Sequence, residues 1–266
     1  MKITNVRFAP WVGCQYVDGL DGLRILLVCE SHYGAKKHER PTATPEIVKA
    51  LALGEMHPLA TKRLRRHPHF TKIMRAVTNT RRHATRDDKA EFWSRVAYYN
   101  FIQEFIRDKR ITPRENSWKS GEDAFSDVLD VLVPDLIVCL SLRNGRRIRS
   151  LAGNTPVAVV NHPSSRFTYS NVNSVVARGK QNALLHKTAK QSFFRSDLFD
   201  RWSKATDSAL PAPGAHLSQE HAASLLTQRQ RAMKELDGTI AALYRLTHNV
   251  VVVGEPRGPF PAQMRG

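Results

Sequence analysis

Residues 25–34 read ILLVCESHYG, and this stretch decides the predicted fold. Four aliphatic residues and a cysteine lead directly into Glu30, Ser31, His32 and Tyr33. A continuous apolar run of this kind is typical of a strand that is buried on both faces of a parallel sheet. The residues that follow offer a carboxylate, a hydroxyl, an imidazole and a phenol. The stretch therefore predicts a central strand that ends in one wall of a functional site.

Similar apolar runs recur along the chain, and helical patterns lie between them. Phe125, Val128, Leu129 and Leu132 fall on one helix face, and this helix is predicted to start after Ser120. Strands that alternate with helices predict an α/β fold with three α/β/α layers and a mostly parallel central sheet of four or five strands. The predicted strands are residues 24–29, 95–102, 135–141, 156–162 and, as a candidate fifth, 250–254.

The chain of 266 residues is predicted to form a single domain with a basic insertion. Residues 35–92 contain 14 Lys and Arg against 6 Asp and Glu, and their apolar positions have helical spacing. This segment is therefore predicted to form two or three basic helices. Residues 191–249 are predicted to be a C-terminal helical part packed on the same domain, with PAPGA at 211–215 as a connector.

The charge balance predicts a polyanionic partner. Lys and Arg number 41 and Asp and Glu 24, which gives a formal net charge of +17. Such a charge attracts nucleic acid first and an anionic membrane surface second. The chain has 3 cysteines and no C-x-x-C pair, so a disulfide framework, a zinc site and an iron–sulfur cluster are not expected. With no signal peptide or membrane-spanning run recognised, a cytoplasmic monomer that needs no cofactor is expected.

Polar residues follow three of the predicted strands. Glu30 and its neighbours end the first, Asn100 ends the second, and His162, Ser164 and Ser165 follow the fourth. In open parallel sheets, ligands bind at the carboxyl ends of the strands. We therefore expect these side chains to form one site.

In their order along the chain, these motifs resemble those of the uracil-DNA glycosylase superfamily. The resemblance covers roughly residues 22–170. The first motif of the superfamily corresponds to the Cys29–Gly34 stretch. The Asn that reads the base in the superfamily corresponds to Asn100 in YYNF, and the H-P-S motif corresponds to NHPSSRF. The resemblance implies an enzyme that flips a nucleotide out of DNA and hydrolyses its glycosidic bond, leaving an abasic site.

The resemblance also implies roles for the residues around the base. His162 would stabilise the negative charge that grows on the pyrimidine O2, and Asn100 would bind the polar edge of the base. Glu30 would form a wall of the site. Tyr33 corresponds to the aromatic residue that rejects a 5-methyl group in the uracil-specific branch. His32 replaces a proline that shapes the first loop, and is a candidate substrate contact.

Other residues would hold the DNA itself. Ser164, Ser165 and Arg166 would contact phosphates, and Arg166 or Phe167 would fill the gap left by the flipped base. Basic clusters would hold the backbone without reading sequence, so that neutralising Arg65 and Arg66 should weaken binding to all DNA sequences alike. The candidate residues in these clusters are Arg65, Arg66, Arg143, Arg146 and Arg147.

Ser31 is the main departure from the family, because it replaces the Asp that positions water in the uracil-specific branch. Water would then be placed by Ser31 or by Glu30. Since the residues most diagnostic for uracil have changed, the favoured substrate is a bulkier base, glucosylated hydroxymethylcytosine of phage DNA, excised in anti-phage defence. Removal of uracil in DNA repair is the alternative.

Two other classes of protein stay open. Ser31 with a His and an Asp could form a hydrolase triad, although the glycines of a nucleophile elbow are missing. A non-catalytic DNA-binding protein would explain the charge without a reaction. The HPH sequence at 67–69 is interpreted as part of a basic or solvated face rather than as a metal site.

Overall fold

The computed structural model describes residues 5–64, 67–108, 110–165 and 167–194. The chain divides into two compact units, residues 1–187 and 188–266. The predicted strand 250–254, and all of the predicted helical part 191–249 beyond residue 194, lie outside the described residues. The single-domain arrangement therefore stays a prediction, and the fold below is that of the first unit.

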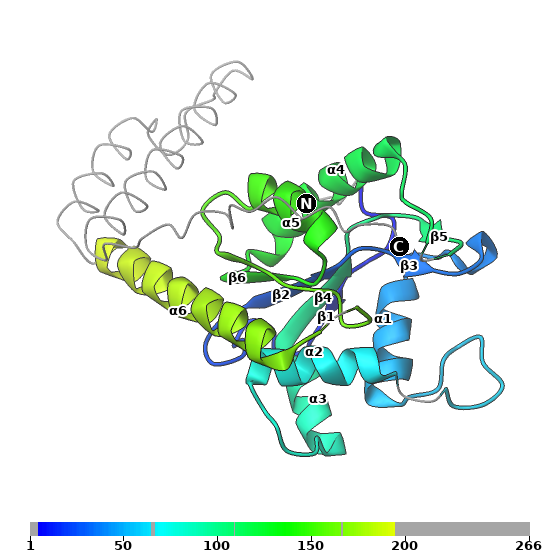
Figure 1. The fold of residues 1–266 in the computed structure, drawn as a ribbon, viewed down its shortest axis with the longest axis horizontal. Helices are drawn as coiled ribbons and strands as arrows, with labels where there is room; N and C mark the ends of the chain where they lie inside the picture. The colour runs from blue at the N-terminus through cyan, green and yellow to red at the C-terminus, as the bar shows by residue number, and fades with distance from the viewer. Residues whose placement is uncertain (1–4, 65–66, 109, 166, 195–266) are drawn as a thin grey trace, which may run out of the picture. The chain divides into compact units, whose positions relative to one another are not determined.

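A five-stranded, mostly parallel sheet forms the centre of this unit (Figure 1). Four strands occur where the sequence predicts them, each shorter than predicted and β7 less than half as long, and they pair in parallel. The fifth is a two-residue antiparallel strand at the edge, too short to give a periodic signal in the sequence. In sheet order the strands are β1 (Trp11–Val12), β4 (Val96–Asn100), β2 (Ile25–Cys29), β6 (Leu136–Cys139) and β7 (Val157–Val159).

A second, two-stranded sheet continues from the ends of the central strands. β3 (His32–Tyr33) follows β2 and pairs in parallel with β5 (Phe105–Ile106), which follows β4. His32 is buried and Tyr33 is exposed, because successive side chains of a strand point to opposite faces. This short sheet therefore places His32 and Tyr33, both from the predicted first motif, on its opposite faces.

One face of the central sheet is covered by α4 (Glu115–Leu132) and α5 (Leu142–Leu151) (Figure 1). The apolar residues that predict α4 are buried or packed against this core. The helix begins at Glu115, earlier than predicted, so Ser120 and Gly121 lie in its interior. Gly121 allows close packing, because a Cβ there would lie 2.6 Å from the Phe101 carbonyl oxygen.

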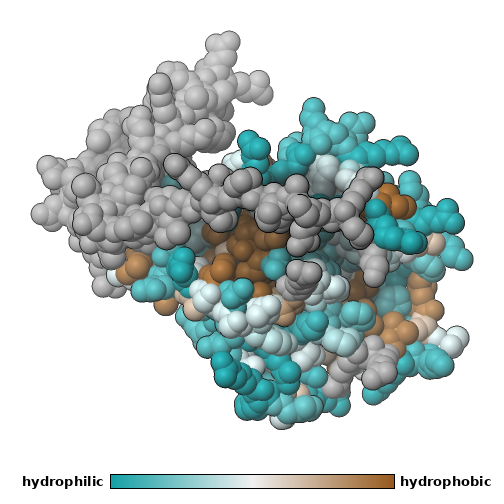
Figure 2. All heavy atoms as spheres, in the orientation of Figure 1, coloured by the Kyte–Doolittle hydropathy of each residue, from teal (hydrophilic) through white to brown (hydrophobic). Residues whose placement is uncertain are grey.

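The basic insertion and α6 (Tyr169–Phe194) cover the other face. Helices form within the described part of residues 35–92, as predicted, and their buried aliphatic and aromatic residues pack on β2 and β4. The surface over α3 in Figure 2 is mainly hydrophilic, which agrees with the charge of this segment. Its elements are η1 (Lys36–His38), α1 (Ala43–Val48), η2 (Lys49–Leu53), α2 (Pro68–Thr78) and α3 (Arg86–Arg95).

Candidate functional site

The sheet order brings the ends of the four parallel strands together in one row. Asn100 ends β4, Glu30 follows β2, Ser141 follows β6, and His162 follows β7. These strands end at the same edge because they run parallel. The edge therefore collects the polar residues that the sequence predicts as a site, together with Ser141, which was not predicted.

Glu30 is a buried carboxylate with both oxygens engaged. An Arg143 guanidinium nitrogen lies 2.7 Å from Oε1, and the Ser141 hydroxyl donates to Oε2 over 3.1 Å. Only 5% of Glu30 is exposed, whereas Arg143 is exposed on the first turn of α5. Arg143 thus balances the charge of the buried Glu30 carboxylate at the site.

His162 is held in a defined tautomer by its own turn. The backbone N–H of Ser164 donates to His162 Nδ1 over 3.1 Å. The N–H and the hydroxyl of Ser165 both donate to the His162 carbonyl oxygen, over 2.8 Å and 2.7 Å. Burial and the nearby Arg143 lower the pKa of His162, so the imidazole is neutral at pH 7. Because Nδ1 accepts, Nε2 carries the proton and is a hydrogen-bond donor.

Asn100 is fixed by a buried network that reaches into the insertion. His32 Nε2 lies 3.1 Å from Asn100 Nδ2 and 2.8 Å from Thr44 Oγ1 on α1. The backbone carbonyl oxygen of Asn100 accepts from the Gln103 side-chain amide over 2.8 Å. Burial lowers the pKa of His32 to about 4, so this ring is also neutral at pH 7. The structure therefore places His32 as a support for Asn100.

The sequence interpretation of the HPH segment is wrong for His69, which lies inside the site. Its Nε2 is 3.7 Å from Cys29 Sγ and 3.4 Å from the Tyr98 hydroxyl. The ring centroids of His69 and His162 are 5.1 Å apart. Burial, followed by the charge of His162, lowers the pKa of His69 to about 3. His67 is exposed and caps α2 instead.

Cys29, His69 and His162 form a group that could hold a metal ion. Their ligand atoms all lie within 4.8 Å of one another, and a thiolate with imidazoles suits zinc. Burial raises the pKa of the Cys29 thiol to about 12, which opposes thiolate formation without a metal. Since His162 Nδ1 already accepts from Ser164, a metal on Nε2 would have to displace its proton. The local hydrogen bonds therefore favour His162 as a donor.

Ser31 and Tyr33 complete the first motif in different ways. The Ser31 hydroxyl is buried and has no hydrogen-bond partner within the described residues. A buried hydroxyl of this kind is able to hydrogen-bond to a water molecule or a ligand. Tyr33 is 44% exposed and faces away from the side on which His32 contacts Asn100.

The predicted DNA contacts have different surroundings. Arg143 and Arg146 are exposed. Arg147 is 2.9 Å from Glu115 and 2.6 Å from Glu122, and it lies over the Trp118 ring. Its charge is therefore already neutralised by α4, which argues against its predicted role at phosphates. Arg65, Arg66 and Arg166 lie outside the described residues.

Phe167 is not free to act as the predicted wedge. It is half-buried, packs against the hydrophobic core, and makes an edge contact with the Tyr169 ring at a centroid distance of 5.6 Å. Ser164 and Ser165 precede it in the same turn and are exposed. The Ser165 hydroxyl already donates to the His162 carbonyl oxygen.

No model of a known protein family matches the chain, and no curated protein is significantly similar to it. Within the described residues, no helix is both long and apolar enough to cross a membrane. The site must therefore be interpreted from its own geometry.

Proposed function

We propose that the protein is a DNA N-glycosylase that excises a modified pyrimidine and leaves an abasic site. The observation that carries this proposal is the tautomer of His162, a neutral imidazole with Nε2–H available at the carboxyl edge of the sheet. The Nε2–H of a neutral imidazole donates a hydrogen bond to a developing anion. The resemblance of NHPSSRF to the family's H-P-S motif assigns the same residue.

The chemistry requires that the electron pair of the glycosidic bond move onto the base. Negative charge then develops on the pyrimidine O2, where the Nε2–H of His162 donates a hydrogen bond. Water adds its hydroxyl to the sugar C1′, and its proton balances the charge on the released base. The buried, unpartnered hydroxyl of Ser31 is the group that we assign to holding this water. Both Glu30 oxygens are engaged, which makes Glu30 the weaker candidate.

Asn100 would bind the polar edge of the flipped base. Its amide contacts His32, which in turn contacts Thr44, so the amide need not be ordered when the base arrives. His69 lies beside His162 and would offer a ring to stack on the base. These groups come from β4, α1 and α2, so the insertion takes part in the proposed site.

We propose glucosylated hydroxymethylcytosine of phage DNA as the excised base. Tyr33, the residue expected to block a 5-substituent, is 44% exposed and faces away from the Asn100 side of β3. This orientation supports a site that admits a large group. Uracil is the second candidate, and a non-catalytic DNA-binding protein is the candidate of another class, supported by the net charge of +17.

A base-release assay tests the proposal directly. Purified protein is mixed with uracil-containing duplex, with unmodified duplex, and with phage DNA that carries glucosylated hydroxymethylcytosine, and abasic sites are counted by alkaline cleavage. We expect abasic sites only in the phage DNA, and none with His162→Ala. Release from the uracil duplex alone would select the second candidate. Tight binding with no release from any substrate would favour the non-catalytic class.

A further inference from the structure

A basic cavity of about 540 Å³ lies between the end of α2, the turn that follows it, and the first turns of α6. Its volume lies in the range of roughly 300–1,000 Å³ that is usual for small-molecule sites. The lining contains two arginines, several polar side chains and no acidic residue. The lining residues are Arg75, Asn79, Thr80, Arg81, Tyr169, Ser170, Asn173, Ser174 and Ala177.

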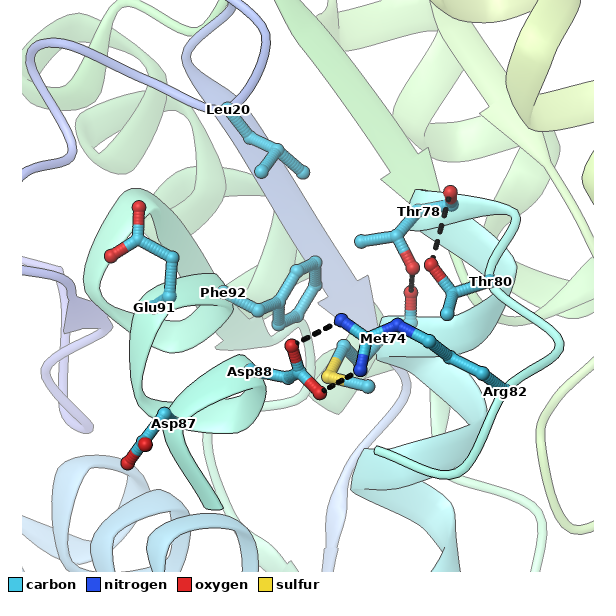
Figure 3. Close-up of a pocket in the computed structure, with 9 residues that line it drawn as sticks. All are labelled: Leu20, Met74, Thr78, Thr80, Arg82, Asp87, Asp88, Glu91 and Phe92. Carbon is cyan, nitrogen blue, oxygen red and sulfur yellow. Dashed lines mark hydrogen bonds and ion pairs between the residues drawn. The ribbon is translucent and has the colours of Figure 1, made fainter. Parts of the chain in front are cut away.

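A second cavity, of about 350 Å³, has the opposite character and shares Thr80 with the first. Asp87, Asp88 and Glu91 line it, and Arg82 is paired there with Asp88 (Figure 3). Arg75 and Arg81 have no carboxylate partner in the described part of the chain. Consecutive arginines of one turn therefore differ: the charge of Arg82 is neutralised, whereas that of Arg81 is available to an anion.

Two polar atoms of the basic cavity have no hydrogen-bond partner among the residues that the structure describes. Arg75 donates through a terminal nitrogen to the Arg82 carbonyl oxygen over 3.3 Å, but its Nε–H is buried and unpaired. Asn173 donates to Asn79 Oδ1, but its own Oδ1 is buried and accepts nothing. Unpaired buried groups of this kind are unfavourable. The cavity thus lacks one acceptor beside Arg75 and one donor beside Asn173.

We propose that this cavity binds a nucleotide of a nucleic-acid strand. Arg75 and Arg81 bind the phosphate, the ring of Tyr169 stacks on the base, and Asn173 Oδ1 accepts a hydrogen bond from an N–H of the base edge. A phosphate supplies acceptors only, whereas a base edge supplies the missing donor. An exposed aromatic ring beside guanidinium groups is typical of single-strand binding. The inference rests on the proposed function in one respect, that the strand is the DNA from which the base is excised.

Helix α2 connects this cavity to the candidate site. The His69 ring contacts the His162 ring at a tilt, with centroids 5.1 Å apart, and one turn later Lys72 Nζ donates to the Pro163 carbonyl oxygen over 2.9 Å. Arg75 follows after a further turn, so it lies about 9 Å along the helix axis from His69. A strand that places one base at His162 could therefore follow α2 and place a neighbouring nucleotide in the cavity.

The test measures the affinity of the full chain for a labelled, unmodified 15-nucleotide single strand by fluorescence anisotropy at several salt concentrations. Arg81→Gln should lower the affinity about fivefold or more and make the salt dependence shallower by about 0.7 in log–log slope. Arg82→Gln is the matched control: it is the next residue and makes the same change in net charge, and it should change the affinity less than twofold. Tyr169→Leu should weaken binding about fivefold or more, and Tyr169→Phe should retain it.

Equal effects of Arg81→Gln and Arg82→Gln would overturn the proposal, as would wild-type affinity of Tyr169→Leu. Arg81 is exposed, so folding of its variant should be preserved, and circular dichroism checks this for all four proteins. The strand carries no excisable base, so the outcome does not depend on base release. The two proposals can fail separately. If Arg81→Gln and Tyr169→Leu alone weaken binding, but the protein releases no base, the cavity binds a nucleotide and the proposed glycosylase activity is wrong.

Discussion

Lys72 donates a hydrogen bond from its ammonium group to the carbonyl oxygen of Pro163 over 2.9 Å. This contact joins residues 91 positions apart in the sequence and ties a helix of the basic insertion to the turn that carries His162. The insertion is therefore part of the candidate site as well as a source of charge.

Lys72→Met should lower the rate of base release about tenfold, because the turn that orients His162 loses its support. The free energy of unfolding should fall by about 1 kcal/mol, the usual net value of one hydrogen bond. Single-turnover kinetics and urea unfolding measure the two effects. Lys62→Met, at an exposed lysine of the same insertion, is the control and should resemble the wild type. A wild-type release rate for Lys72→Met would show that the contact does not orient the site.

His162→Ala and Asn100→Ala should each lower the release rate by about 100-fold or more, because each removes a group that contacts the base in the proposed transition state. Binding to DNA should change less than twofold, since neither residue is assigned to phosphates. Rates from alkaline cleavage and affinities from anisotropy separate the two effects. His83→Ala, at an exposed histidine, is the control. If both site variants release bases at the wild-type rate, the assignment of the site is wrong.

Ser31→Ala should lower the release rate about tenfold without destabilising the fold. The hydroxyl is buried and has no partner within the described residues, so its removal deletes an unpaired polar group. Ser141→Ala is the contrasting variant, because its hydroxyl donates to Glu30 and its loss should destabilise the protein. Urea unfolding of both variants gives the comparison. A marked loss of stability in Ser31→Ala would indicate that the hydroxyl has a structural role.

Arg143→Met should lower the free energy of unfolding by about 2 kcal/mol, because it leaves the Glu30 carboxylate buried without its cation. The effect should be smaller than for a fully buried pair, since Arg143 is 48% exposed in its side chain. Adding Glu30→Gln should restore most of the stability. A double variant as unstable as Arg143→Met would argue against this ion pair as the cause.

Stability should fall as the pH is lowered from about 6.5 to 4. In this interval the unfolded chain protonates His32, while the folded chain does not, since burial lowers its folded pKa to about 4. Titration of His32 should lower the free energy of unfolding by roughly 3 kcal/mol at pH 4, and this loss of stability should vanish above pH 7. His32→Gln should reduce the slope of stability against pH without abolishing it, because His69 titrates in the same direction. An unchanged slope would show that His32 does not contribute.

The strands and the fold class could be predicted from the sequence because buried parallel strands are continuous apolar runs. ILLVC and LIVC give this signal directly. The edge strand Trp11–Val12 could not be predicted, since two residues have no measurable period. The predicted start of α4 is too late because Ser120, followed by the acidic Glu122 and Asp123, resembles a helix N-terminus, whereas the helix begins at Glu115.

The candidate site was only partly predictable. Glu30, Asn100 and His162 follow apolar runs, and parallel pairing brings them to one edge. Arg147 lies in a basic cluster that predicts DNA binding. In the structure it pairs with Glu115 and Glu122, which lie more than 20 residues earlier in the sequence, on α4. Such pairing depends on how two helices pack and leaves no local pattern.

By itself, the sequence determined the parallel sheet, the basic helical insertion and the strand ends that carry Glu30, Asn100 and His162. These features follow from hydrophobic periodicity and from the rule that parallel strands end at one edge. Only the tertiary structure decided that His69 lies against Cys29 and His162, and that Arg81 is available where Arg82 is paired. The physical reason is that burial and charge pairing depend on side chains that are distant in sequence and meet only when the helices pack on the sheet.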